Sequence, residues 1–136
     1  MSAATWTAIV AATIVGLACS DGSVGIVGEW DLVSYGTQTE QEPALADRGA
    51  TVVFEAGGDV HGHTGCNTFG GRYEADGMRL VFEDVYQTLI GCGDAVRQQE
   101  AAMMGALQTE SMVEFDGDTA TLLAEGSDAV IVLSRR

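Results

Sequence analysis

Short stretches of alternating apolar and polar residues occur along the chain, and this period of two predicts β-strands. In the first of them, residues 29–35, Trp30 and Leu32 alternate with Glu29 and Asp31, so both apolar side chains are expected on one buried face. Comparable stretches lie at 51–55, 60–64, 71–74, 78–82, 85–90, 111–115, 119–123 and 129–134. Turns that contain glycine separate most of them, which predicts antiparallel hairpins.

One stretch has a helical period instead. Between residue 94 and about residue 109, Val96, Met103 and Leu107 recur at helical spacing, and Asp94 is the predicted N-cap. About eight short strands and one helix predict a mainly β domain, either a curved antiparallel sheet or a small barrel with the helix packed on it.

Glu100 lies on the apolar stripe of this helix, and a buried carboxylate needs partners. It is expected either at the solvent rim or in a structural hydrogen bond to the glycine-rich segment or to Arg72. A catalytic acid is the least favoured alternative, because the sequence places no second carboxylate beside it.

The glycine-rich segment, residues 62–73 (GHTGCNTFGGRY), predicts a tight connection between two strands. Glycine is used where a Cβ does not fit, and asparagine tolerates left-handed backbone. The polar stretch 36–49 contains the only proline and is expected to be a long loop.

The length and the net charge of the chain limit the number of domains and the classes of partner that we expect. The chain has 136 residues, enough for one domain, with 20 acidic and 6 basic residues, a net charge of −14 and no lysine. Such a surface repels nucleic-acid phosphates and anionic lipid headgroups, so no nucleic-acid partner is expected. The acidity is most simply explained by solubility or salt adaptation, and a cationic ligand or partner is the alternative.

The N-terminus predicts export. Residues 1–18 carry no charged side chain, and an apolar run ends at Leu17-Ala18-Cys19, which resembles a bacterial lipobox. We therefore expect a signal peptide of the lipoprotein type at 1–18, lipidation of Cys19 and a flexible tether at 19–27. The mature protein would lie in the cell envelope, anchored to a membrane on its extracytoplasmic side.

The chain has three cysteines, so lipidation of Cys19 would leave Cys66 and Cys92 as a pair. In an oxidising compartment, a disulfide is the simplest state of such a pair. Two reduced core thiols are an alternative, and a tetrahedral zinc site of His61, His63, Cys66 and Cys92 is a further one. A cysteine nucleophile with a histidine base is least favoured, since no oxyanion site is evident.

These residues together resemble the META domain of HslJ-type heat-shock lipoproteins. The resemblance begins at Trp30, continues through Val60-His61-Gly62, and covers about residues 28–134, the expected domain. Its motif positions are Gly65, Cys66, Asn67, Phe69, Gly71 and Tyr73, followed by Thr88 and Cys92 in a T-x-x-x-C pattern and by Glu100 on the helix.

The resemblance implies a lipocalin-like antiparallel half-barrel and an envelope lipoprotein linked to stress tolerance, with no known enzymatic activity and no cofactor. The favoured function is a non-catalytic domain that binds a partner protein or a small ligand. The second hypothesis is an envelope protease inhibitor or chaperone-like domain, because small barrels of this general shape serve as protease inhibitors. An enzyme is the third.

Overall fold

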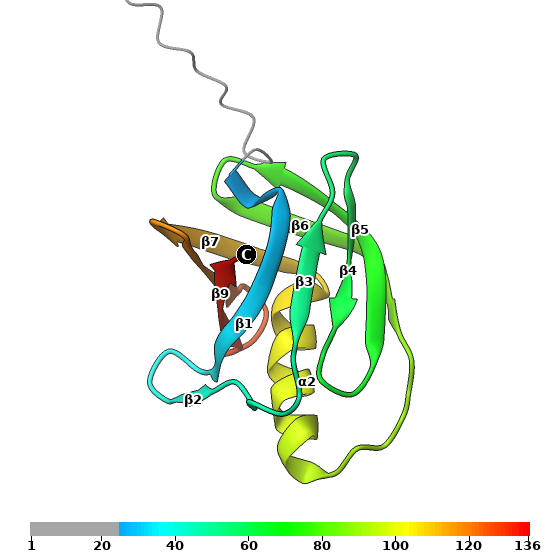
Figure 1. Cartoon of the computed structure of the whole chain (residues 1–136). Helices are drawn as coiled ribbons and strands as arrows, with labels where there is room; N and C mark the ends of the chain where they lie inside the picture. Colours follow the sequence, from blue (N-terminus) through cyan, green and yellow to red (C-terminus); the bar gives the residue numbers. More distant parts are fainter. Residues whose placement is uncertain (1–24) are drawn as a thin grey trace, which may run out of the picture.

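The computed structural model describes residues 25–136 (Figure 1). The expected signal peptide, the Cys19 lipidation site and residues 19–24 of the expected tether lie outside the described residues.

Residues 28–135 form one antiparallel sheet and one helix, joined mostly by short turns. The strands are β1 Gly28–Gly36, β2 Gln41–Pro43, β3 Thr51–Phe54, β4 Asp59–His63, β5 Thr68–Asp76, β6 Arg79–Gln87, β7 Glu110–Asp116, β8 Thr119–Ala124 and β9 Val130–Arg135, and the helix is α2 Asp94–Leu107. From β3 to β9, each strand pairs with the next one along the chain. Sequential pairing of this kind is what hairpin turns between alternating stretches produce.

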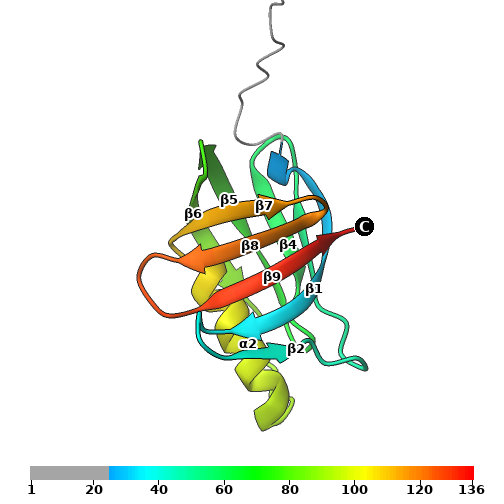
Figure 2. The same ribbon diagram turned by 90° about the vertical axis from the view of Figure 1, so that its left-hand side faces the viewer.

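The sheet closes on itself through β1 and β9. Their pairing extends from Trp30 opposite Arg135 to Gly36 opposite Val130, and Figure 2 shows the two strands side by side in one wall with β7 and β8. The other edge of β1 pairs with β3 near its start and with β2 near its end. The lipocalin-like expectation is confirmed, with one refinement: the sheet is a closed barrel and not a half-barrel, because β1 uses both of its edges.

Large apolar side chains fill the interior of the barrel. Trp30 is fully buried and Leu32 almost so, as their alternation predicts. The core also contains Val52, Phe54, Val60, Phe69, Tyr73, Leu80, Phe82, Val113, Ala120, Leu122, Ile131 and Leu133. The rings of Phe54 and Tyr73 meet edge to face with their centroids 5.0 Å apart, an arrangement that aromatic quadrupoles favour.

Helix α2 packs at one end of the barrel, where it contacts β1, β7, β8 and β9 (Figures 1 and 2). Val96, Met103 and Leu107 are buried, which confirms the helical stripe. The expectation that Asp94 is the N-cap is wrong. Gly93 occupies that position, and no side chain caps the helix there. No helix within residues 25–136 is long and apolar enough to cross a membrane.

Strand β6 differs from the two strands expected at 78–82 and 85–90. It is continuous from Arg79 to Gln87, with Asp84 in left-handed backbone (φ 54°) where its pairing with β5 changes register. A bulge of this kind interrupts the alternation without ending the strand. Residues 88–90 do not continue the strand, although their composition favours it.

The expectation of a flexible tether is wrong for residues 25–27, which belong to the domain. Ile26 is fully buried, and its carbonyl accepts a hydrogen bond from the indole N–H of Trp30 at 2.8 Å. The guanidinium of Arg135 donates to the carbonyls of Val27 at 2.9 Å and Gly25 at 2.7 Å. The tail of the chain therefore holds this segment against the barrel.

Candidate functional site

The glycine-rich segment forms the hairpin between β4 and β5. The backbone N–H of Thr64 donates to the carbonyl of Asn67 at 2.8 Å, and the N–H of Asn67 donates to the Thr64 hydroxyl at 2.9 Å. Gly65 has a φ of +98°, and a Cβ there would lie 2.7 Å from Nε2 of Gln99 on α2. Glycine is thus required both by the backbone conformation and by the close approach of the helix.

Asn67 connects this hairpin to the segment between β6 and α2. Its Oδ1 accepts hydrogen bonds from the Thr88 hydroxyl at 2.8 Å and from the backbone N–H of Ile90 at 2.7 Å. Its Nδ2 donates to the carbonyl of Ile90 at 3.2 Å and to Oε2 of Glu100 at 2.7 Å. The side chain is almost fully buried, and these four bonds use its whole hydrogen-bonding capacity.

Glu100 makes the structural hydrogen bond expected of it. Its Oε2 accepts from Asn67 and, at 2.6 Å, from the Thr64 hydroxyl. Both partners belong to the glycine-rich segment, and Arg72 is not among them. The carboxylate is half-buried, and bonds of this type between a charged acceptor and a neutral donor are stronger than neutral ones. Glu100 therefore orients Asn67 through Oε2, the oxygen that both donors share.

Gln99 is a site residue that sequence reasoning missed. It is fully buried, its Oε1 accepts from the backbone N–H of Leu45 at 2.9 Å, and its Nε2 donates to the carbonyl of Thr64 at 2.8 Å. It therefore joins the long loop after β2 to the β4–β5 hairpin. The signal was available, because Gln99 lies three residues after Val96 and four before Met103, on the buried stripe.

Cys66 and Cys92 form the expected disulfide, with their Cα atoms 5.8 Å apart. Bonded sulfurs are neither thiolate ligands nor nucleophiles, so the zinc set, the free thiols and the cysteine nucleophile are all excluded for this state. His63 Nδ1 accepts from the Gly65 N–H at 2.9 Å, and His61 Nε2 lies 3.1 Å from Oε1 of Glu55. No group of three potential metal ligands occurs within residues 25–136.

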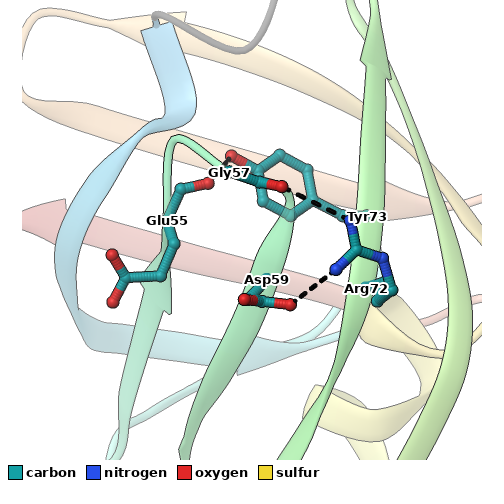
Figure 3. Close-up of polar contacts among 5 residues, drawn as sticks. All are labelled: Glu55, Gly57, Asp59, Arg72 and Tyr73. Carbon is teal, nitrogen blue, oxygen red and sulfur yellow. Dashed lines mark hydrogen bonds and ion pairs between the residues drawn. The ribbon is translucent and has the colours of Figure 1, made fainter.

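Arg72 and the motif residue Tyr73, both on β5, stabilise the neighbouring hairpin. Figure 3 shows Arg72 reaching Asp59 Oδ1 at 2.8 Å and the carbonyl of Gly57 at 3.3 Å. In the same view the Tyr73 hydroxyl donates to the carbonyl of Glu55 at 2.7 Å. These contacts fix the turn between β3 and β4.

Phe69 is buried in the core, and Gly71 faces Val85, whose Cγ2 would lie 2.9 Å from a Cβ at this position. Each motif residue thus has a packing or hydrogen-bonding role.

What these contacts hold in place is an apolar stretch on the surface. The side chains of Tyr86, Leu89 and Ile90 are 68%, 88% and 62% exposed. Leu89 and Ile90 lie between Thr88 and the disulfide, in the segment that Asn67 binds. Leu89 and Ile90 are adjacent in the chain and both exposed, so this segment is the candidate interaction surface.

Comparisons with known proteins agree with this architecture. The NMR structure of a protein from Burkholderia xenovorans is 17% identical, with a TM-score of 0.66 over 85% of this chain and 86% of that one. A second NMR structure is 15% identical, with a TM-score of 0.65 over 79% of this chain and 88% of that one. The crystal structure of a DUF4847 family protein from Bacteroides vulgatus is 17% identical, with a TM-score of 0.53 over 89% of this chain and 98% of that one.

At such identities the likeness shows the fold alone. No curated protein matches the chain. The sequence model of the META domain matches residues 25–136, which are all of the residues that the structure describes. The chain therefore belongs to the META domain family.

Proposed function

We propose that this META domain is a non-catalytic binding protein of the cell envelope, anchored by a lipid on Cys19, and that its ligand is a partner protein. The resemblance to HslJ-type heat-shock lipoproteins supports a role in stress tolerance.

The main support for the proposal is that the polar side chains of the site are bonded to other parts of the same domain. Asn67, Glu100 and Gln99 bind other parts of the same domain, and the cysteines bind each other. Catalysis needs a group that is free to meet substrate. Instead, this arrangement fixes the segment that exposes Leu89 and Ile90, which is what a protein-binding surface requires.

The filled interior favours a protein over a small ligand inside the barrel. Lipocalin-like barrels that bind ligands have an internal cavity. Here Trp30, Phe54, Leu122 and Ile131 are fully or almost fully buried inside, and helix α2 packs at one end of the barrel. The second hypothesis, a protease inhibitor, is supported by the exposure of Leu89 on a braced loop, whereas no contact within residues 25–136 supports chaperone-like activity.

Cross-linking in the native cells tests partner binding. The whole chain, Leu89→Asp and a matched control, Met78→Asp, are compared; Met78 is 45% exposed, in the β5–β6 turn. We expect a cross-linked envelope protein with the wild type and with Met78→Asp, and its loss with Leu89→Asp. A cross-link unchanged in all three proteins would contradict a binding surface at Leu89. A small molecule that co-purifies in stoichiometric amount would contradict a protein ligand.

Fractionation tests the anchor. The Cys19→Ser variant should leave the membrane fraction or accumulate as an unprocessed precursor, because it has no sulfur to carry the lipid. If this variant still requires detergent and is processed as the wild type is, Cys19 is not the anchor.

A further inference from the structure

The segment 88–93, between β6 and α2, presents one leucine at its outermost point. Leu89 is 88% exposed, the largest value among the exposed large apolar residues of the described chain. The segment makes neither turn nor bend over these residues, and Figure 1 shows it as a long connection on the outside of the barrel.

Both neighbours of Leu89 are fixed by the domain. The backbone N–H of Thr88 donates to the carbonyl of Thr68 at 3.0 Å, and its hydroxyl donates to Asn67. The N–H and the carbonyl of Ile90 are both bound to the Asn67 amide. The disulfide at Cys92 holds the chain two residues further on.

Leu89 itself is left free. Within residues 25–136, no hydrogen bond is made by its backbone N–H or carbonyl. A residue with free backbone groups and an exposed side chain can pair with a partner's strand while its side chain enters a pocket. Because its neighbours are already ordered, little conformational entropy would be lost on binding.

We infer that segment 88–93 is a substrate-like loop that inhibits a serine protease, with Leu89 in a primary specificity pocket that accepts apolar side chains. The inference rests on the proposed function, a protein-binding domain, and names its partner by class. Proteases of this class bind extended peptides and select the residue before the scissile bond by the shape and charge of that pocket.

The bracing also explains how such a loop would resist cleavage. Attack of the protease's serine Oγ on the Leu89 carbonyl carbon forms an ester and breaks the Leu89–Ile90 C–N bond, while the serine proton passes through the catalytic histidine to the Ile90 nitrogen. Asn67 and the disulfide would keep that amine beside the ester. The amine can then attack the ester, re-form the peptide bond and return the proton to serine before water enters.

A membrane surface is the other occupant that exposed Leu89 and Ile90 could suit. Segments that insert into the lipid interface carry basic residues on their polar side. This chain has no lysine, and Asp94 directly follows the segment. The charge therefore favours a protein partner.

The test uses the whole chain, expressed with export and purified in its oxidised form, against chymotrypsin and trypsin. Chymotrypsin has an apolar primary pocket and trypsin an acidic one. We expect the wild type to inhibit chymotrypsin and not trypsin, and L89R to inhibit trypsin while its inhibition constant for chymotrypsin rises by about 100-fold. The control M78R, which adds the same charge at another exposed apolar side chain, should behave as the wild type.

Folding of each variant is checked by its circular dichroism. The mass of the intact protein checks that the Cys66–Cys92 disulfide has formed. Two results would overturn the inference. In the first, the wild type does not inhibit chymotrypsin and L89R does not inhibit trypsin. In the second, either protein is digested after position 89 without inhibiting the protease. If the wild type sediments with neutral phosphatidylcholine vesicles, L89R does not, and neither inhibits a protease, the loop binds a membrane instead. A Leu89-dependent envelope cross-link without inhibition would preserve the proposed function and refute only the protease.

Discussion

The side-chain amide of Asn67 binds both the backbone N–H and the backbone carbonyl of Ile90, much as the backbone of a neighbouring strand would. One buried amide can do this only if it is itself held in a single orientation, and Glu100 provides that by accepting from Nδ2. The residue before Asn67 is in the disulfide. Two adjacent residues of the hairpin therefore determine the path of a segment more than 20 positions later in the chain.

Loss of Glu100 should destabilise the domain. In Glu100→Ala, the Thr64 hydroxyl and the Asn67 amide would lose a charged acceptor, at a cost of about 2–3 kcal/mol in the free energy of unfolding. Glu100→Gln keeps an acceptor oxygen and should cost about 1 kcal/mol. Urea unfolding measures both, and Glu114→Ala, at an exposed position of β7, is the control. Equal midpoints for all three variants would mean that Glu100 orients nothing.

Trp30→Ala should be the most costly apolar truncation. The side chain is fully buried, donates to Ile26, and lies against the guanidinium of Arg135 at 4.3 Å from the ring centroid. Truncation of a buried tryptophan costs about 3–5 kcal/mol, so the melting temperature should fall by well over about 10 °C. The neighbouring exposed Val33→Ala is the control. A fall of only a degree or two would show that Trp30 does not anchor the core.

At the scale of elements, alternation located the strands well where one face is buried and the other is exposed. The burial of Trp30 and Leu32 in β1 follows the pattern directly. Pattern reasoning failed at β2, whose three residues are all exposed and carry no alternation. It failed again at Asp84, because a bulge shifts the alternation by one residue and makes one strand look like two.

The candidate site was partly predictable. The cysteine pair and the helical position of Glu100 followed from counting and spacing, whereas the partners of Glu100 depend on how the helix meets the β4–β5 hairpin. Residues 88–90 were mistaken for the end of a strand because Leu89 and Ile90 are apolar. In the structure, the Asn67 side chain binds the backbone N–H and carbonyl of Ile90, where a strand would bind a neighbouring strand. Composition does not reveal that a side chain takes the place of a strand.

The start of helix α2 offers a matched pair of glycines. A Cβ would have open space at both Gly91 and Gly93, but only Gly93 has a positive φ, of 97°. Gly93→Ala should therefore lower the free energy of unfolding by about 1 kcal/mol or more. Gly91→Ala, the control, should leave it unchanged or raise it slightly. Denaturant midpoints compare the two, and an equal response would mean that the left-handed backbone at Gly93 is not required.

At the scale of the whole molecule, the disulfide joins the β4–β5 hairpin to the segment that leads into α2. The bonded cysteines are 26 positions apart, and the chain-entropy account gives about 3.5 kcal/mol for a loop of this size. The double variant Cys66→Ala/Cys92→Ala should lose roughly that amount, a large share of a small domain's net stability. Guanidinium unfolding of the oxidised protein and the double variant measures it. Equal midpoints would show that the disulfide does not stabilise the domain.

Asn67 and its partners hold segment 88–93 in one conformation and leave Leu89 free. Amide hydrogen exchange followed by NMR tests this most directly, because each backbone N–H is observed separately. We predict slow exchange at Thr88 and Ile90 and fast exchange at Leu89 between them. In Asn67→Ala, protection at Ile90 should be lost while that of buried Leu122 in β8 remains. Fast exchange of Ile90 in the wild type, or its undiminished protection in Asn67→Ala, would show that Asn67 does not hold this segment.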